Sequence, residues 1–366
     1  LKRNYTNGKI VAVTGSSGKT SVKDLIGNLL KNYGETYFSP KSYNNFYGVP
    51  LSLCNLEQSH KFGVFEIGMS KKGEIDTLSK IVKPDIAIIT NIAEAHIENF
   101  KNLYQIAKAK GEIIENISSQ GNLIIDRDSK FYSYFNSKAK KNNIKVTSVG
   151  FNTKSDIKIV KVQNFTKYKF VKIKLYKKNL VIKTGNQLVK NIAFAIAVLK
   201  TLNLDINKIK NKIHDINILE GRGKIYKIKY KNLNFNLIDE SYNANPLSMK
   251  QSIINLSNVK DKYQKYILLG DMLELGSKSQ ILHESLSPII NHSKINKLFV
   301  HGEHIMNTYK NVNKSKRGNI LQEKSDFKEI LLPILQNNDY LMIKGSNATG
   351  LKKISENLTK GRINVI

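Results

Sequence analysis

Hydrophobic and polar residues follow two different periodic patterns along the chain. In the first two-thirds, short and nearly continuous apolar runs are separated by segments of helical periodicity. Buried strands that alternate with helices are typical of a parallel sheet covered on both faces. The predicted strands are Ile10–Thr14, Gly63–Ile67, Asp85–Thr90, Leu123–Asp126 and Lys145–Val149, and the predicted helices are Ser21–Asn32, Gly73–Val82, Leu103–Ile117 and Ser129–Lys141.

The pattern changes between Asp156 and Thr184, where apolar and polar residues alternate one by one. This period of two predicts an antiparallel meander. Two helices are expected after it, over Leu188–Leu202 and Ile206–Ile216. The Gly-Arg-Gly turn at 221–223 then marks a break in the pattern. We therefore expect two domains, residues 1–218 and residues 219–366.

Alternation of strands and helices resumes after this turn and predicts a second, smaller α/β domain. The Tyr226–Lys231 run alternates lysine with apolar residues and is interpreted as the solvent face of a strand. Further strands are predicted at Leu233–Asp239, Tyr266–Leu269, Lys297–Val300 and Tyr340–Ile343, and helices at Pro246–Leu256, Gln280–Asn291, Phe327–Leu335 and Ala348–Leu358.

Composition adds few constraints to this picture. The chain has 366 residues, 40% of them hydrophobic, and 59 basic against 29 acidic residues give a formal net charge of +30. The lysines are spread over every segment with no basic tail, which favours anionic small molecules over nucleic acid as partners. The single cysteine excludes an internal disulfide and a cysteine zinc cluster, and it fits a cytoplasmic location. No apolar run is long enough to span a membrane.

The most informative stretch is Gly8–Leu30, where an apolar strand enters a Gly/Ser turn and a Lys-Thr pair opens a helix. This layout predicts a phosphate-binding loop, because backbone N–H groups and the positive end of the helix dipole face a bound anion. Lys19 is expected to reach the outer phosphates of a nucleotide, and the Thr20 hydroxyl to bind Mg²⁺. The generic pattern has a glycine where this chain has Val13, so the turn is a shorter form. The residues expected at the nucleotide are Thr14, Gly15, Ser16, Ser17, Gly18, Lys19 and Thr20.

Polar residues also follow the predicted strands at their carboxyl ends, where α/β sheets bind ligands. Glu66 ends one strand, Thr90 and Asn91 end the next, and His96 lies in the loop that follows. Carboxylate and imidazole groups near a nucleotide are candidate Mg²⁺ partners, although oxygen is the more usual ligand. Taken singly, each of them also fits a purely structural role.

Together these motifs resemble the Mur ligases, the ATP-dependent amide-forming enzymes of peptidoglycan precursor synthesis. The resemblance rests on ordered motifs that cover essentially the whole chain, and the short TGSxGKT loop of that family accounts for Val13. The C-terminal motifs resemble the D-alanyl-D-alanine-adding branch, the MurF type. The motifs are TGSSGKTS, SYNNFYGVP, FEIG, TNIAEAH and IAKAKGEI in the first domain, and IDESYNANPLSM, LLGDMLELG and IKGSN in the second.

The resemblance implies an α/β protein with a central P-loop domain, mainly a parallel sheet, and a smaller Rossmann-like C-terminal domain. It implies a cytoplasmic ligase that uses ATP and Mg²⁺ to join UDP-N-acetylmuramoyl-tripeptide and D-alanyl-D-alanine through an acyl phosphate. We expect a monomer that binds no nucleic acid and does not insert into membranes. Remaining alternatives are another amide ligase, such as a folylpolyglutamate synthetase, and a nucleic-acid-stimulated ATPase.

The family pattern also implies roles for individual residues. Lys19 would hold the outer phosphates, Thr20 and Glu66 one Mg²⁺, and His96 a second Mg²⁺ together with Lys110 as its carbamate. The residues alone do not choose between Lys108 and Lys110; the resemblance selects Lys110. Further residues implied at ATP are Asn191, Arg222, Asp239 and Asn243, and those implied at the other substrates are Asn44, Asn45, Asp271, Lys344 and Ser346.

The chain departs from the family pattern at several positions. Gln187 and Leu188 replace the usual His-Asn of the adenine helix, Glu240 replaces an aspartate, and Asn347 replaces an arginine. The resemblance further implies an N-terminal domain that binds the UDP-sugar. The sequence begins at the linker before the phosphate loop and lacks an initiator Met, so we expect a truncated form.

Overall fold

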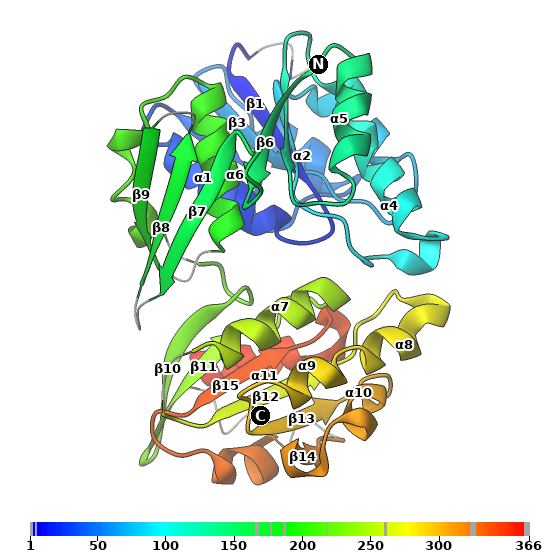
Figure 1. Cartoon of the computed structure of the whole chain (residues 1–366), viewed down its shortest axis with the longest axis vertical. Coiled ribbons are helices and arrows are strands. Elements are labelled where there is room, and N and C mark those ends of the chain that lie inside the picture. Colours follow the sequence, from blue (N-terminus) through cyan, green and yellow to red (C-terminus); the bar gives the residue numbers. More distant parts are fainter. Residues whose placement is uncertain are drawn as a thin grey trace. The chain divides into compact units, whose positions relative to one another are not determined.

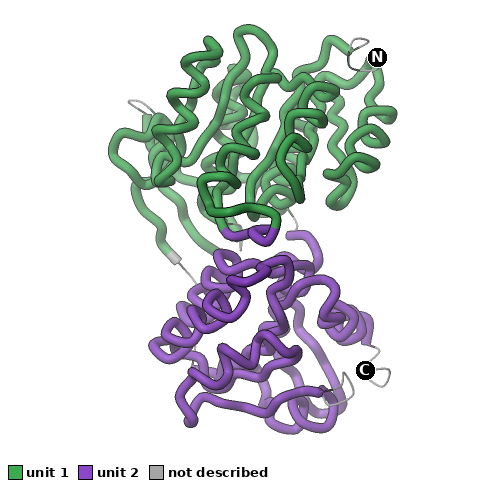
Figure 2. Tube along the Cα trace, turned by 90° about the vertical axis from the view of Figure 1, so that its right-hand side faces the viewer, with its two compact units in different colours: residues 1–93, 99–217 green, residues 94–98, 218–366 purple. Residues whose placement is uncertain are grey.

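The computed structural model divides the chain into two compact units, which are described separately. The first comprises residues 1–93 and 99–217, and the second comprises residues 94–98 and 218–366 (Figure 2). The short segment 94–98 thus belongs with the C-terminal unit although it lies in the first half of the sequence. The structure describes residues 3, 6–164, 168–175, 178–185, 188–216, 218–259, 262–322 and 327–361.

A nine-stranded sheet forms the centre of the first unit, with strand order β2-β3-β1-β4-β5-β6-β7-β8-β9 (Figure 1). All pairings from β2 to β7 are parallel, and β7, β8 and β9 continue the sheet as an antiparallel meander. The strands are β1 Lys9–Thr14, β2 Thr36–Phe38, β3 Phe62–Glu66, β4 Ile86–Ile89, β5 Asn122–Asp126, β6 Lys145–Gly150, β7 Ile157–Asn164, β8 Lys169–Leu175 and β9 Lys178–Thr184.

Helices cover this sheet on both faces, as the continuous apolar strands predict. Strand β1 is buried from Ile10 to Thr14, with no alternation, because neither face meets solvent. Helices α1 and α6 pack against each other and share one core with the strands. The helices are α1 Lys19–Leu30, α2 Gly48–Cys54, α3 Glu74–Val82, α4 Leu103–Lys110, α5 Tyr132–Lys141 and α6 Val189–Thr201.

Three features of this unit differ from the sequence prediction. The helix expected over Leu103–Ile117 ends at Lys110 and continues as a 3₁₀ helix over Gly111–Asn116, since glycine is a weak helix former. The prediction of a helix over Ile206–Ile216 is wrong, because only the 3₁₀ turns Ile206–Lys208 and Ile213–Asp215 form there. The segment is rich in β-branched residues and asparagine, which are poor helix formers. Strand β2 and helix α2 were not predicted, since both are short.

The C-terminal unit contains a six-stranded sheet with order β10-β11-β15-β12-β13-β14. Strands β10 and β11 pair antiparallel, and all other pairs are parallel. The strands are β10 Lys224–Tyr230, β11 Leu233–Asp239, β12 Lys265–Gly270, β13 Lys297–His301, β14 Arg317–Ile320 and β15 Tyr340–Lys344, and the α-helices are α7 Pro246–Ser257, α8 Ser279–Glu284, α9 Ser287–Asn291, α10 Met306–Asn311 and α11 Leu351–Thr359.

Helix predictions in this unit fail where proline or glycine intervenes. The segment Gln280–Asn291 is split into α8 and α9, with a proline near the start of α9. The segment Phe327–Leu335 contains a π turn followed by a 3₁₀ turn instead of an α-helix, and it also holds a proline. Helix α11 begins after Gly350, whose φ is 77°. Strand β14 and helix α10 were not predicted.

The α/β class and the mainly parallel sheets are confirmed. Among the described residues, no helix has the length and apolar character that a membrane span requires.

Candidate active site

The phosphate loop forms at the carboxyl end of β1, between that strand and α1. Gly15 has a φ of 146°, and a Cβ there would lie 1.9 Å from the Thr90 Oγ1, so only glycine fits. Gly18 has a φ of 77° and precedes the helix. The first intrahelical hydrogen bond runs from the Val22 N–H to the Gly18 carbonyl, which leaves the N–H groups of the first turn available for an anion.

The end of β4 fastens this loop in place. The Asn91 Oδ1 accepts a hydrogen bond of 2.9 Å from the Ser17 N–H, and the Thr90 hydroxyl donates to the Ser17 carbonyl at 2.7 Å. The Ser16 N–H donates to the Asn91 carbonyl, and its hydroxyl bonds to the backbone of Ala93. The N–H groups of Ser16 and Ser17 are therefore occupied by the protein. We infer that both serines shape the loop and that the helix start supplies the anion donors.

The Lys19 side chain lies over the loop, where its Nζ donates to the Gly15 carbonyl at 2.9 Å. Thr20 is buried, and its hydroxyl lies 3.3 Å from the hydroxyl of Ser42. The Thr14 hydroxyl is also buried and has no hydrogen-bond partner. A polar group buried without a partner costs free energy, and at a functional site it commonly waits for a ligand.

Glu66 stands at the end of β3 next to the loop, because Val13 and Glu66 are paired residues of neighbouring strands. Its side chain is buried, with 1% of the residue exposed. One carboxylate oxygen accepts a hydrogen bond of 2.6 Å from the Asn44 amide, whereas Oε2 has no partner. An unpaired, buried carboxylate oxygen is a suitable ligand for a hard cation such as Mg²⁺. Asn45 instead accepts hydrogen bonds from the Tyr47 and Gly48 N–H groups at the start of α2.

The two candidate lysines of α4 lie in opposite environments. Lys110 is 1% exposed, and its Nζ has no hydrogen-bond or ion-pair partner among the described residues. Burial, and next the charge of Lys19, lower the pKa of Lys110 well below the usual value for lysine. Lys108 is exposed and lies over the Tyr104 ring, with its Nζ 4.9 Å from the ring centroid. Of the two lysines, only Lys110 is buried, and its environment favours the uncharged amine.

The residues of the first unit fit an Mg²⁺ site, although no cluster of three or more acidic, histidine or cysteine side chains suited to a metal occurs in the described part of the chain. The unpaired Glu66 oxygen, the Thr20 hydroxyl and a modified Lys110 would be the protein donors. A nucleotide's phosphate oxygens and water would complete the set, as is usual for Mg²⁺.

Helix α6 brings Asn191 to the same loop. Asn191 is buried, and its Oδ1 lies 3.8 Å from the position that a Cβ on Gly18 would take. The neighbouring Lys190 makes contacts of 2.6 Å with Asp126 and 3.0 Å with Asp128, which anchor the start of α6 at the end of β5. Burial raises the pKa of Asp126 despite this pairing. Gln187, which departs from the family pattern, lies outside the described residues.

In the C-terminal unit, Arg222 lies in a turn built around Asp239. The Asp239 carboxylate accepts hydrogen bonds from the Gly221 N–H and from the N–H and hydroxyl of Ser241, at 2.7, 3.2 and 2.6 Å. The Arg222 guanidinium stacks on the Tyr242 ring, 4.2 Å from its centroid. Asp239 therefore braces the turn. Tyr242, which the sequence analysis did not single out, orients Arg222.

Two further groups of predicted residues are held by neighbouring loops. The buried Lys344 pairs with Glu240 at 3.2 Å and donates to the Asn243 carbonyl. The longer Glu240 side chain thus still pairs with this lysine although the family pattern has aspartate there. The Asn243 side chain accepts from the Ala244 N–H.

The second group lies at the ends of β12 and β15. The Asp271 carboxylate accepts hydrogen bonds from the Glu303 and Ile305 N–H groups, at 3.2 and 2.7 Å. The Ser346 N–H donates to the Asp271 carbonyl, and its hydroxyl accepts from the Leu273 N–H. Asn347 is exposed.

His96 belongs to the second unit through segment 94–98 and has a left-handed backbone, with a φ of 57°. Its Nδ1 lies 2.7 Å from the Glu274 Oε2. This contact has the distance of a salt bridge but not the angles of a hydrogen bond. The imidazole lowers the pKa of the Glu274 carboxyl. The sequence offered no signal for this pair, because its members lie far apart along the chain.

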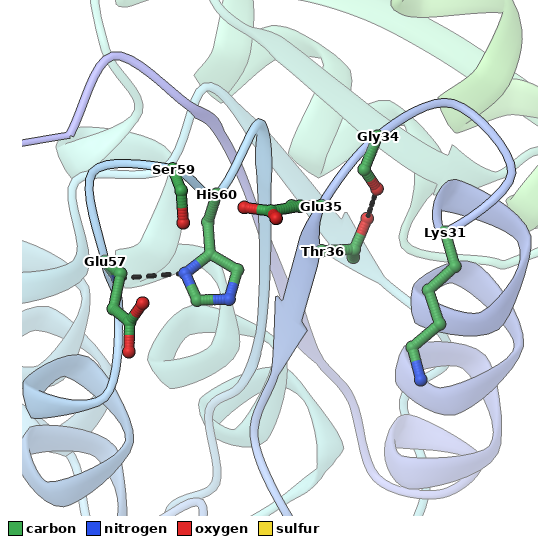
Figure 3. A pocket seen from close by; sticks show the side chains of 7 residues that line it. All are labelled: Lys31, Gly34, Glu35, Thr36, Glu57, Ser59 and His60. Atoms are coloured by element: carbon green, nitrogen blue, oxygen red, sulfur yellow. Dashed lines mark hydrogen bonds between the residues drawn. The ribbon is translucent and has the colours of Figure 1, made fainter.

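A separate hollow of about 490 Å³ lies at the other edge of the first sheet, next to the amino ends of β2 and β3 (Figure 3). Ligands of parallel sheets bind at the carboxyl ends, so this hollow is remote from the phosphate loop. Its His60 Nδ1 accepts from the Glu57 N–H at 2.9 Å, and its acidic and basic side chains are exposed. The lining residues are Lys31, Gly34, Glu35, Thr36, Glu57, Ser59 and His60.

Comparisons with known proteins agree with this architecture. Residues 13–199 match the family model of the Mur ligase middle domain, and residues 226–347 match that of the Mur ligase, glutamate ligase domain. The UDP-N-acetylmuramoyl-tripeptide–D-alanyl-D-alanine ligase of Buchnera aphidicola subsp. Acyrthosiphon pisum is 33% identical over 371 residues, which cover 98% of this chain and 78% of that protein. The same-named ligase of Buchnera aphidicola subsp. Baizongia pistaciae is 35% identical over 307 residues, 82% of this chain and 65% of that protein.

Solved structures give the same result. The crystal structure of MurF from Acinetobacter baumannii superposes with a TM-score of 0.88 at 25% identity, over 98% of this chain and 78% of that one. MurF from Thermotoga maritima in complex with ADP has the same fold, with a TM-score of 0.85 at 23% identity over 100% of this chain and 83% of that one. The phosphate loop, the two units and these matches lead to one conclusion: the chain belongs to the Mur ligase family.

Proposed function

We propose that this chain carries out the ATP-dependent addition of D-alanyl-D-alanine to UDP-N-acetylmuramoyl-tripeptide, a step of peptidoglycan precursor synthesis. The observation that carries the proposal is a pair of groups beside the phosphate loop that have no partner among the described residues: the buried Glu66 carboxylate oxygen and the amine of the buried residue Lys110. The names of the relatives support the choice of substrates.

The reaction has two stages. The terminal carboxylate of the tripeptide attacks the γ-phosphorus of ATP, so that a C–O–P linkage forms and ADP leaves. The amine of D-alanyl-D-alanine then attacks the carbonyl carbon of this acyl phosphate, gives up a proton and expels inorganic phosphate. No nucleophilic side chain is required, and positioning and electrostatics supply the catalysis.

The phosphate loop holds the nucleotide in this proposal. The N–H groups at the start of α1 and the ammonium group of Lys19 face the phosphates, and Lys19 exchanges its contact with the Gly15 carbonyl for the outer phosphates. Asn191, whose Oδ1 lies near Gly18, is the proposed contact of the adenine. In the second unit, Arg222 and Asn243 are the proposed ATP contacts, and Asp239 acts by holding the Arg222 turn.

Thr20 and Glu66 would hold one Mg²⁺, and His96 and the carbamate of Lys110 would hold a second. When bound, these ions would neutralise charge on the transferring phosphoryl group. The uncharged form of the Lys110 amine would form its carbamate by attack of Nζ on the carbon of CO₂ with loss of one proton, which gives the side chain a pair of carboxylate oxygens. Burial favours the uncharged amine that this step needs.

Residues of both units are proposed at the acceptor substrates. Asn44 touches the Glu66 carboxylate and would lie close to the reacting carboxylate, with Asn45 beside it. Asp271, Lys344 and Ser346 would bind the dipeptide, chiefly by ordering the loops that they bridge. A monomeric state, a cytoplasmic location and the absence of a nucleic-acid partner remain part of the proposal.

Phosphate release in the presence of ATP, Mg²⁺ and UDP-N-acetylmuramoyl-tripeptide tests the assignment. We expect release to rise on addition of D-alanyl-D-alanine, with amide product detected by mass spectrometry. D-glutamate and single-stranded DNA should have no effect. Both this chain and a form extended upstream should be assayed. Release by the extended form that ignores D-alanyl-D-alanine would refute the substrate assignment, and stimulation by DNA would favour an ATPase.

The carbamate is tested by a matched pair of lysine variants. Lys110→Ala should lose about 10²–10³-fold in rate, as for removal of one electrostatic group, and short carboxylic acids should restore part of it. Lys108→Ala, in the next exposed position of the same helix, should keep the activity. Rescue of Lys108→Ala in place of Lys110→Ala would move the carbamate to Lys108.

A further inference from the structure

Segment 94–98 lies in the first half of the sequence but groups with the C-terminal unit in the structure. It follows β4, whose end fastens the phosphate loop, and it falls within the part of the chain that matches the Mur ligase middle domain. By its contacts, however, it belongs to the C-terminal unit (Figure 2). The loop that carries His96 is thus held by residues from the other half of the chain.

The contacts involve the loop that follows β12. The His96 Nδ1 lies 2.7 Å from the Glu274 Oε2, and the Glu98 N–H donates to the Glu274 carbonyl at 3.3 Å. A Cβ on Gly276 would lie 3.0 Å from the Glu98 Cβ, so the two backbones pack closely. One residue, Glu274, therefore holds the segment through both its side chain and its main chain.

Both residues of the His96–Glu274 contact have a left-handed backbone. His96 has a φ of 57° and Glu274 a φ of 61°, both in the left-handed region that non-glycine residues rarely occupy. Such conformations cost free energy and persist where the surroundings fix them. A strained pair of side chains in contact points to a defined geometry that the fold maintains.

The Nδ1 of the His96 imidazole is buried, whereas another part of the side chain is accessible to solvent. Nδ1 is buried, yet a quarter of the His96 side chain, 25%, is exposed. The exposed part of the side chain therefore lies on atoms other than Nδ1. Histidines that bind metals commonly donate their second N–H to a carboxylate, which fixes the tautomer and the ring orientation.

We propose that Glu274 is a positioning residue for His96: the negative charge of its carboxylate, 2.7 Å from Nδ1, keeps the proton on that nitrogen, so that Nε2 is the nitrogen available to a divalent cation. The inference rests on the proposed function, in which His96 is a metal ligand. Removal of Glu274 should therefore release the loop that carries His96.

The first test reads the imidazole without metal or substrate. The chain has seven histidines, so ¹⁵N-histidine labelling with a His96→Gln variant identifies the His96 signals. We expect the wild type to hold the Nδ1–H tautomer, Glu274→Ala to show a mixture, and Glu274→Gln to lie between them because its amide oxygen still accepts. An unchanged tautomer in Glu274→Ala would overturn the proposal.

The second test measures Mn²⁺ binding by electron paramagnetic resonance in the presence of a non-hydrolysable ATP analogue. Loss of a carboxylate that orients a metal-binding histidine typically weakens metal affinity by about 10–100-fold. Glu274→Ala should show a loss of this size, and Glu284→Gln, whose carboxylate accepts only from Gln280 on the same helix, should bind like the wild type. Equal affinity of Glu274→Ala and wild type contradicts the proposal.

The outcomes separate this inference from the proposed function. If the wild type lacks D-alanyl-D-alanine-dependent phosphate release but the tautomer and Mn²⁺ affinity still depend on Glu274, the substrate assignment fails and the positioning role stands. If the wild type is active and neither property depends on Glu274, only the positioning role fails. Thermal melting of each variant identifies a change that comes from unfolding, and a Glu274→Ala variant that melts before these readouts is replaced by Glu274→Gln.

Discussion

The polar groups beside the phosphate loop differ in their partners from those that shape the loops of the C-terminal unit. Beside the phosphate loop, the Thr14 hydroxyl and one Glu66 oxygen are buried without a partner, and the buried residue Lys110 has an amine with no partner among the described residues. In the C-terminal unit, the carboxylates of Asp239 and Asp271 each accept hydrogen bonds from the protein's own loops. Buried polar groups without partners are costly, so the first set indicates a site that a ligand completes.

This contrast suggests a division of labour. Groups that are left unsatisfied can bind a cation or phosphate without first breaking an existing bond. Groups that are already satisfied fix the shape of loops, as Asp239 does for the turn that carries Arg222. Substitutions in the first set should therefore reduce catalysis more than stability, and substitutions in the second should do the reverse.

The largest expected effect is at Glu66. Glu66→Gln should lower the ligation rate by about 10²–10³-fold, because it removes a charged oxygen that stabilises the reacting phosphates. Its melting temperature should stay unchanged or rise, since a buried charge without a full set of partners is lost. Steady-state phosphate release and thermal melting measure the two effects.

The matched control for that variant is Glu115→Gln, a half-exposed glutamate that pairs with Lys138 at 2.7 Å. It should change neither property. A Glu66→Gln enzyme that melts early but retains its rate would assign Glu66 to the structural set.

A smaller effect is expected at Asp239. In Asp239→Asn the amide nitrogen cannot accept a hydrogen bond, so either Gly221 or Ser241 loses its partner. The cost should be about 1–3 kcal/mol of unfolding free energy, with faster hydrogen exchange at the Gly221 amide. Denaturant unfolding and amide exchange check this, and Asp215→Asn, at a carboxylate whose side chain is 78% exposed, should have no effect. Normal stability with abolished ATP binding would show a direct contact to the nucleotide.

The smallest effect concerns pH and Lys110. Its pKa in the folded protein lies below that of the unfolded chain, so between the two values the unfolded chain binds more protons. Stability should therefore rise with pH in that window, and the penalty of burying the amine should be fully present below it. Lys110→Met removes the penalty and should raise the melting temperature by a few degrees, at about 2–4 °C per kcal/mol.

Melting curves in CO₂-depleted buffer from about pH 6 to pH 10 test this prediction, since lysine ordinarily titrates near 10.4. The difference between Lys110→Met and wild type should be largest at the low end and shrink toward pH 10. A difference that does not vary with pH would mean that packing, not protonation, separates the two proteins.

Individual elements show which features of the fold could be predicted from the sequence. Strand β11 has the predicted bounds Leu233–Asp239, because its pattern of apolar residues and its turns are local signals. The helix expected over Ile206–Ile216 is absent, because regular spacing of isoleucine did not outweigh poor helix formers. The sequence predicted that Thr90 and Asn91 lie at a strand end. Their hydrogen bonds to the phosphate loop, however, depend on the pairing of β1 with β4.

The sequence by itself determined the phosphate loop and the α/β class, because strand, glycine turn and helix start follow one another along the chain and need only local conformations. The tertiary structure decided which lysine is buried, which oxygen of Glu66 is left without a partner, and that Glu274 faces His96. These properties depend on burial and on contacts between segments far apart in the sequence. Their free energies come from the surroundings of a side chain, and a linear pattern does not specify those surroundings.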